Sequence, residues 1–140
     1  MSKLIKKLSV FFPVYNEEER VVGIVENAKK ILSEIASDWE ILVINDGSKD
    51  KTLEVSKKLA EGDKRVRVIN HVTNRGYGAA LKSGFYNARY PWITFTDADG
   101  QFDFSEIIKF IEKQKETQAD LVIGYYLKRQ VSFFRKVNTF

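Results

Sequence analysis

The sequence predicts an α/β fold, a mostly parallel sheet with helices on both faces. Short apolar runs alternate along the chain with longer segments in which apolar residues recur every three or four positions. Strands joined by crossover helices produce this alternation, and such strands form a parallel sheet that is buried on both sides. A polar or glycine-containing segment follows each of the first four runs, as expected for loops at the ends of buried strands.

The elements can be placed in order along the chain. The first run, residues 8–12, stops at Pro13 and precedes an apolar stripe with helical spacing between Val21 and Ile35. The second run, residues 40–44, ends in a turn signal at 45–48. The same unit then repeats. It predicts a helix through Leu53, Leu59 and Ala60, a strand over 65–70, a helix over 78–89, a strand over 92–96, a helix over 104–118 and a fifth strand over 121–123.

Composition limits the classes of protein that the chain can belong to. With 140 residues, 44% hydrophobic and 30% charged, it fits one globular domain with a proper core. There is no cysteine and one histidine, His71, so a disulfide framework, a zinc site and a thiol site are not expected, and any metal would need oxygen ligands. No segment resembles a signal peptide or the roughly 20 apolar residues of a spanning helix, which predicts a soluble, cytoplasmic domain.

The charge of the chain permits anionic ligands without choosing among them. The formal net charge is +4 and the isoelectric point is near 9.2, which suits nucleotides, nucleic acid or an acidic membrane surface. The basic residues are scattered along the predicted helices and are not interleaved with aromatic residues in an RNA-binding pattern. Nucleic acid is therefore not expected as the ligand.

The segment 97–101, with the sequence DADGQ, is the motif that most limits the function. It follows directly after the apolar run 92–96. Asp97 and Asp99, one residue apart at the end of a buried strand, make a site for a hard cation that leaves positions open for phosphates. The alternative is a turn that only caps the helix predicted to begin near Phe104.

Three further polar segments follow predicted strands: PVYNE at 13–17, NDGS at 45–48 and NRGYG at 74–78. In an open parallel sheet, ligands bind at the carboxyl ends of the strands, where the strand order reverses. Each segment has an ordinary explanation by itself, as a helix start, a turn or a glycine loop. Together with 97–101, they predict a common binding site at one edge of the sheet.

These segments also resemble a known family. The sequences FPVYNE at 12–17, VINDGSKDKT at 43–52, NRGYGAA at 74–80 and DADGQ at 97–101 are similar to the ordered motifs of family 2 glycosyltransferases. The likeness is greatest to the polyprenyl-phosphate branch, the dolichyl-phosphate mannose synthase type. It implies the GT-A (nucleotide-diphospho-sugar transferase) fold with a Rossmann-like N-terminal half.

The resemblance covers residues 8–124 and implies two regions. Residues 1–124 are expected to form a nucleotide-sugar-binding domain. Residues 125–140 form a basic aromatic segment, which we expect to begin a further acceptor or membrane-proximal region. Within this segment, residues 127–140 could lie on an anionic membrane surface or equally be part of a core that continues beyond this chain.

The resemblance assigns the nucleotide pocket to residues on the first two loops. Pro13, Tyr15 and Glu17 match positions that line one wall, where Tyr15 would contact the base and Glu17 would accept a hydrogen bond from base or ribose. Ile44 and Asp46 match the other wall, where Asp46 would hold the base or ribose. Ordinary packing at strand ends remains the alternative for Tyr15 and Ile44.

The diphosphate and the metal are assigned to the DADGQ segment. The resemblance implies that Asp97, Ala98 and Asp99 contact the donor, with Asp97 and Asp99 as catalytic residues. Asp97, Asp99 and Gln101 would bind Mg²⁺ or Mn²⁺, which neutralises the departing nucleoside diphosphate.

One departure from the family pattern concerns the phosphates. The family usually has an arginine two residues after the glycine that follows the fifth strand, and here Tyr126 stands at that position. Arg129 and Arg135 are expected to bind the donor phosphates instead, because guanidinium groups match phosphate geometry. Solvated surface charge is the alternative for both.

The function expected from the resemblance is metal-dependent, inverting transfer of a hexose from a nucleotide diphosphate sugar, of the GDP-mannose or UDP-glucose type, to a polyprenyl (dolichyl) phosphate. A phosphate acceptor is already an anion, so no general base is needed. The enzyme would act at the cytoplasmic face of the membrane. The alternatives are a family 2 enzyme with a polysaccharide or glycolipid hydroxyl acceptor, and a nucleotide-sugar-binding module without turnover. A dinucleotide oxidoreductase is disfavoured because no G-x-G-x-x-G motif follows the first strand.

Overall fold

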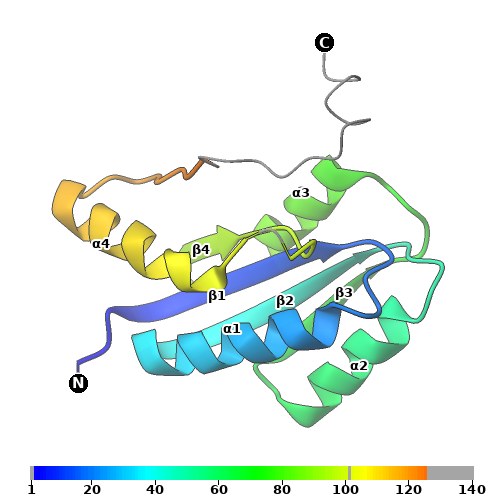
Figure 1. Ribbon diagram of the computed structural model, residues 1–140. Helices are drawn as coiled ribbons and strands as arrows, with labels where there is room; N and C mark the ends of the chain where they lie inside the picture. The colour runs from blue at the N-terminus through cyan, green and yellow to red at the C-terminus, as the bar shows by residue number, and fades with distance from the viewer. Residues whose placement is uncertain (1, 101, 126–140) are drawn as a thin grey trace.

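In the part of the chain that the structure describes, four parallel strands form the sheet, in the spatial order β3-β2-β1-β4. The computed structural model describes residues 2–100 and 102–125 (Figure 1). The chain adds β2 and β3 on one side of β1 and then returns to place β4 on the other side, so the strand order reverses between β1 and β4. The strands are β1 (Ile5–Val14), β2 (Ala36–Asp46), β3 (Val66–His71) and β4 (Trp92–Phe95).

Helices cover both faces of this sheet, as the sequence predicts. One face packs against α1 (Val21–Ile35), α2 (Thr52–Gly62), the short 3₁₀ helix η1 (Phe104–Glu106) and α4 (Ile107–Thr117). The other face packs against α3 (Tyr77–Asn87). In Figure 1, α1 and α4 lie on the near side of the sheet and α3 lies behind it.

Successive side chains of β1 point to opposite faces of the sheet, and those on both faces are apolar. Val10 and Phe12 point into the core under α1 and η1, whereas Phe11 between them points into the smaller core under α3. All three are buried. A run without polar alternation is thus the sequence expected for a strand with a helix layer on each side.

Close contact between α3 and β1 depends on a glycine. A Cβ atom on Gly84 would lie 2.4 Å from the ring of Phe11, so only glycine lets the helix approach this closely. The Phe11 ring stacks on Phe95 with centroids 5.0 Å apart and meets the edge of Phe85 at 5.1 Å. These contacts hold α3 against the centre of the sheet.

A buried carboxylate anchors the connection from α3 to β4. Glu40 accepts hydrogen bonds from the Ser9 hydroxyl at 2.7 Å, the Arg89 backbone N–H at 2.7 Å and the Arg67 Nε at 3.2 Å. Its side chain is 6% exposed, and the donors offset the cost of burying it. The network joins β1, β2, β3 and the segment that leads into β4.

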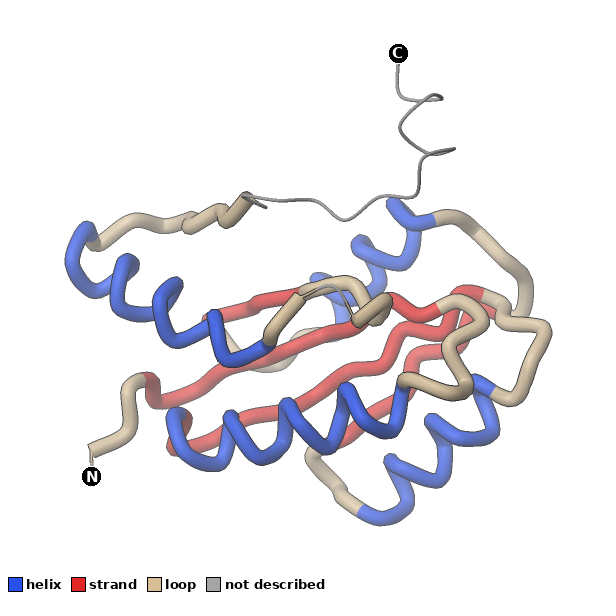
Figure 2. The backbone as a smooth tube through the Cα atoms, in the orientation of Figure 1, coloured by secondary structure: helices blue, strands red, loops and turns tan. Residues whose placement is uncertain are grey.

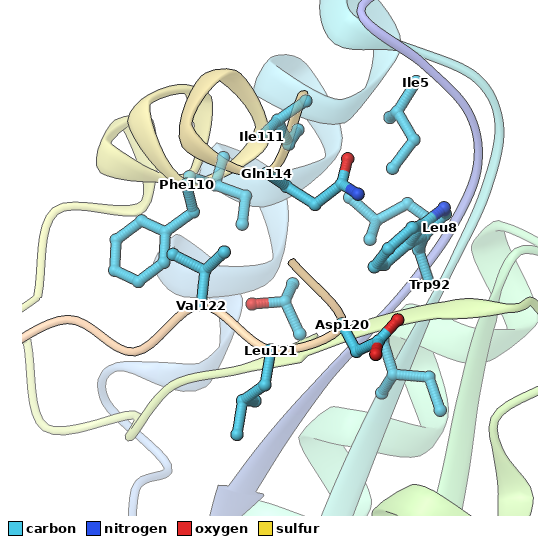
Figure 3. A pocket seen from close by; sticks show the side chains of 12 residues that line it. Ile5, Leu8, Trp92, Phe110, Ile111, Gln114, Asp120, Leu121 and Val122 are labelled. Carbon is cyan, nitrogen blue, oxygen red and sulfur yellow. The ribbon is translucent and has the colours of Figure 1, made fainter. Parts of the chain in front are cut away.

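The predicted fifth strand is wrong. Residues 121–123 lie in a segment that forms no ladder with any described strand, and the sheet of the described chain has four strands. Leu121 and Ile123 are about three-quarters exposed. An apolar triplet becomes a strand only where a neighbour offers a free edge in register. Here a pocket separates the segment from β4 (Figure 3).

This pocket lies between β4, α4 and residues 120–122 (Figure 3). Its walls are mainly apolar and include Leu8, Trp92, Ile111 and Leu121. Trp92 begins β4, so the pocket is near the amino ends of the strands. It is therefore separate from the polar loops at the carboxyl ends.

The other predicted elements are confirmed with small shifts of their ends. The strand predicted over 40–44 is longer and runs over Ala36–Asp46, and the helix predicted over 104–118 divides into η1 and α4. Among the described helices, none has the length and apolar character of a membrane-spanning segment.

Gly84→Ala should lower the free energy of unfolding by about 1–3 kcal/mol, because the new methyl group would overlap the Phe11 ring. Urea denaturation followed by circular dichroism measures the change. The matched control is Gly23→Ala in α1, where a Cβ atom meets nothing within 4 Å. That variant should gain about 0.5–1 kcal/mol from helix propensity alone. Equal effects of the two substitutions would contradict the packing argument.

Candidate functional site

The polar loops that follow the strands gather at one end of the sheet. All four strands run in the same direction, so their carboxyl ends share an edge. Figure 2 shows the loops after β1, β2 and β3 meeting there, while the loop after β4 lies over the sheet beside them. Hydrogen bonds join each of these loops to the next one along the chain.

The loops after β1 and β2 are joined through Asn16. Its backbone N–H donates to the Ser48 hydroxyl at 3.0 Å, and its side-chain oxygen accepts from the Lys49 N–H at 2.8 Å. Asn16 has a φ of 53°, a left-handed conformation that asparagine tolerates better than most residues. The Glu17 N–H donates to the Thr52 hydroxyl at 2.8 Å. The two loops therefore form one hydrogen-bonded unit.

The predicted nucleotide-pocket residues of the first loop lie on this unit. Tyr15 is 42% exposed, and its ring is available to a ligand. The Glu17 carboxylate accepts from Arg20 Nη1 at 3.0 Å, which holds it beside the start of α1. Pro13 is half-buried and lies opposite Ile44 in the register of β1 and β2. Neither Asn16 nor Glu17 caps α1, which begins at Val21.

Asp46 joins the loops after β2 and β3. Its carboxylate accepts hydrogen bonds from the Arg75 N–H at 2.9 Å, the Gly76 N–H at 3.0 Å and His71 Nδ1 at 2.8 Å. Burial by itself would raise the pKa of Asp46. The hydrogen bonds from Arg75, His71 and Gly76 outweigh it and hold the pKa below the usual value. The carboxylate is therefore charged near neutral pH.

Gly47 lets these two loops touch. It has a φ of +69°, and a Cβ atom there would lie 2.2 Å from the backbone N of Asn74. Only glycine fits this contact, because both the conformation and the space exclude a side chain. The Asp46 hydrogen bonds and the Gly47 contact thus fix the position of the 74–76 segment.

The loop after β4 is joined to the start of α3. The Tyr77 hydroxyl donates to the Asp97 carboxylate at 2.8 Å. Asp97 is exposed, Asp99 is half-buried, and Ala98 between them is 3% exposed. The small buried side chain therefore anchors the loop while the flanking carboxylates remain accessible.

The capping alternative for this loop fails. Helix η1 begins at Phe104, and its first turn is capped by Asp103, whose carboxylate accepts from the Ser105 N–H at 2.9 Å. Asp97 and Asp99 do not cap it. Their placement therefore needs another explanation than helix initiation.

One residue that was predicted to line the nucleotide pocket lies in the core instead. Ile44 has no exposed surface and packs with Phe11, Leu42 and Ala80 under α3. The alternation of β2 places its side chain on the α3 face of the sheet, two residues before Asp46, so it supports the site from within the core. Gln101, Arg129 and Arg135 lie outside the described residues.

Two residues at the site were given no role by sequence reasoning. His71 ends β3 and contacts Asp46, and Tyr77 begins α3 and contacts Asp97. Their positions were visible in the sequence, since one ends a predicted strand and the other belongs to a polar loop. Their partners are distant in sequence, so local patterns could not identify the contacts.

The carboxylates of the loop after β4 suit a metal ion that also binds a substrate. Among residues 2–100 and 102–125, no group of three or more Asp, Glu, His or Cys side chains could hold a metal ion. Asp97 and Asp99 supply carboxylates, the ligands that Mg²⁺ and Mn²⁺ prefer. Mg²⁺ commonly binds through one or two carboxylates plus waters and substrate phosphates. The residues present fit that kind of site.

Comparison with known proteins gives a consistent picture. The model of the family described as "Glycosyl transferase family 2" matches residues 9–139. A human dolichyl-phosphate beta-glucosyltransferase is 39% identical over 111 residues, covering 74% of this chain and 34% of the relative. An undecaprenyl-phosphate 4-deoxy-4-formamido-L-arabinose transferase of Salmonella choleraesuis is 36% identical over 134 residues, covering 94% of this chain and 40% of the relative. The chain thus spans less than half of either relative.

A solved structure shows the same fold. The mannosyltransferase PcManGT from Pyrobaculum calidifontis, in complex with GDP-Man and Mn²⁺, superposes with a TM-score of 0.62 at 21% identity. The match covers 72% of this chain and 30% of that one. The predicted GT-A fold is confirmed.

Asp46→Asn should lower the free energy of unfolding by about 1–3 kcal/mol at pH 7, because an amide nitrogen would face an N–H donor and the charge would be lost. The pKa of Asp46 is lowered in the folded protein, so its stabilisation is present above the unfolded value near 4 and is lost as the pH falls. The stability gap between wild type and variant should therefore narrow below about pH 4. Urea titrations at pH 7, 5 and 3.5 measure it, and a constant gap would contradict the assignment.

Proposed function

Since the chain belongs to glycosyltransferase family 2, we propose that it carries the donor-binding part of an enzyme that transfers a hexose from a nucleoside diphosphate sugar to a polyprenyl phosphate. The names of both curated relatives include a polyprenyl phosphate, dolichyl in one and undecaprenyl in the other. They support the class of acceptor. The donor would be a UDP- or GDP-hexose.

The observation that carries this proposal is the joining of the four polar loops at one edge of the sheet. Asn16 connects the first loop to the second, Asp46 the second to the third, and Tyr77 the third to the fourth. Aromatic and carboxylate groups for a nucleoside thus share an edge with the two carboxylates of the fourth loop. A nucleoside diphosphate has these two parts, an aromatic base and an anionic tail.

The base would bind on the side of the first two loops. Tyr15 offers an exposed ring for stacking, and Glu17 offers a carboxylate that is held by Arg20. A carboxylate accepts about four hydrogen bonds, and the structure fills three positions on Asp46. The remaining position would accept an N–H from the edge of the base or a hydroxyl from the ribose.

The diphosphate would bind beside the fourth loop. Asp97 and Asp99 would hold Mg²⁺ or Mn²⁺ together with the phosphates, and Gln101 is proposed as a further ligand. When bound there, the ion supplies charge neutralisation for the departing nucleoside diphosphate. The Tyr77 hydroxyl fixes the direction of the Asp97 carboxylate, so one oxygen is oriented before the ligand arrives. Arg129 and Arg135 are proposed to bind the donor phosphates.

A phosphate acceptor would need no general base, and the histidine at the site is not placed to act as one. His71 is buried and its two nitrogens contact Asp46 and Ser83, so it is not placed to remove a proton from an acceptor. A phosphate monoester is an anion near neutral pH and attacks without deprotonation. The reaction is then a single displacement that inverts the anomeric carbon.

We further propose that the protein works at the cytoplasmic face of a membrane. A polyprenyl phosphate resides in the bilayer, and the net charge of +4 favours contact with anionic lipid. The basic aromatic segment 127–140, which lies outside the described residues, is the proposed contact.

Asp99→Ala should weaken Mn²⁺-dependent binding of the donor nucleotide at least about tenfold while the melting temperature stays within a few degrees, because the loop lies outside the core. Calorimetric titration of the chain with UDP, GDP, UDP-glucose and GDP-mannose, with and without Mn²⁺, measures this. The matched control is Asp103→Ser, which removes the same charge from the same loop but keeps a capping oxygen for Ser105. Binding of full strength in Asp99→Ala would overturn the metal assignment.

The acceptor class is tested by incubating the enzyme that contains this chain with the donor and a short polyprenyl phosphate. The matched control is the corresponding polyprenol, which lacks only the phosphate. We expect a glycosylated lipid phosphate from the first and no product from the second. Transfer to a sugar hydroxyl would favour the polysaccharide or glycolipid alternative, and donor binding without transfer would identify a nucleotide-sugar-binding module.

A further inference from the structure

His71 has no part in the chemistry proposed above, yet it lies at the centre of the candidate site. It is the single histidine of the chain, it ends β3, and it is 5% exposed. Its Nδ1 is 2.8 Å from the Asp46 carboxylate, and its Nε2 is 2.7 Å from the Ser83 hydroxyl. Both ring nitrogens are thus engaged, by β2 on one side and by α3 on the other.

The partners determine the direction of these hydrogen bonds. The charged Asp46 carboxylate can only accept, so Nδ1 carries the proton and donates it. With the proton on Nδ1, Nε2 faces the Ser83 hydroxyl, which can donate to it. The imidazole therefore links the carboxylate to α3 in one orientation, much as a carboxylate partner fixes a metal-bound histidine.

Asp46 in turn controls the backbone of the third loop. It receives the N–H groups of Arg75 and Gly76, and the next residue, Tyr77, donates to Asp97. The path runs from Ser83 through His71 and Asp46 to the loop and on to Asp97. It connects the base side of the site with the diphosphate side.

We propose that His71 is a positioning residue of the donor site. It sets the orientation of the Asp46 carboxylate and, through it, the place of residues 74–77, so that the base side and the diphosphate side keep a fixed spacing. This inference rests on the proposed function for the identity of the ligand. The effect on the loop itself can be tested without any ligand.

Two substitutions separate the contacts of the ring. His71→Asn places an amide nitrogen near the position of Nδ1 and can still donate to Asp46. His71→Gln reaches toward the position of Nε2 and can still contact Ser83, but its amide lies beyond the Nδ1 position. Both remove the ring, so both lose similar packing. They differ in which of the two hydrogen bonds survives.

Val66→Ala is the control for stability alone. Val66 lies on the same strand, is 2% exposed and packs in the core on the α1 side, without contact to the Asp46 network. It should lower the melting temperature and leave nucleotide affinity unchanged. If His71 had only a structural role, its variants would likewise lower the melting temperature and leave the nucleotide affinity unchanged.

The first readout is the amide signals of Arg75 and Gly76 in ¹⁵N-resolved spectra of the free chain, together with their hydrogen exchange. His71→Gln should shift both signals and speed both exchange rates, whereas His71→Asn should keep them near the wild-type values. The second readout is the affinity for the nucleoside diphosphate with Mn²⁺. It should fall about tenfold in His71→Gln and less than about threefold in His71→Asn.

The outcomes distinguish this inference from the proposed function. If the wild-type chain binds no nucleotide, the proposed function fails, and the amide signals still decide the positioning role. Unchanged Arg75 and Gly76 signals in His71→Gln would overturn it. Equal losses of affinity in the two His71 variants, tracking their melting temperatures, would overturn it as well.

Discussion

The buried Asp46 carboxylate is the interaction on which the arrangement of the candidate site depends. A charged group in this position would be costly without partners, and three donors from β3 and the following loop compensate it. The same hydrogen bonds prevent the 74–76 segment from moving independently of β2. One carboxylate thus holds the loops after β2 and β3 together as one wall of the site. The close contact between Gly47 and the backbone of Asn74 leaves no space between these loops.

Helix α3 extends this rigidity across the sheet. In the order β3-β2-β1-β4, the strands β3 and β4 are the two edges, so no ladder hydrogen bond joins the loops that follow them. The helix packs over the central strands through the contact between Gly84 and Phe11, and its side chains reach both the β3 edge and the β4 edge of the sheet. Ser83 contacts the residue that ends β3, and Tyr77 contacts the loop after β4. The separation of the two halves of the site is therefore set by how closely the helix approaches the sheet.

This arrangement is well matched to a ligand with an aromatic end and an anionic end. The chain belongs to family 2 and has the GT-A fold. For the proposed nucleoside diphosphate sugar, the joined loops would offer one place for the base and another for the diphosphate. Binding groups that are fixed in advance lose little entropy when the ligand arrives, which favours catalysis by positioning and charge neutralisation. The proposed acceptor, a polyprenyl phosphate, is already charged and would need only positioning and charge neutralisation from the protein.

The sequence by itself determined the β-α alternation, four of the strands, the loops that carry the polar residues and the family. These features are local, because strand and helix periods and glycine-containing turns are written in neighbouring residues. It also predicted a fifth strand over 121–123, which the structure lacks, because an apolar run does not specify whether a partner edge is within reach. Only the tertiary structure decided that Ile44 belongs to the core, that Asp103 caps η1, and that His71 meets Asp46 across 25 residues of sequence. Such contacts depend on which face of a strand a side chain occupies and on how closely a helix can approach, and neither is a property of a short stretch of chain.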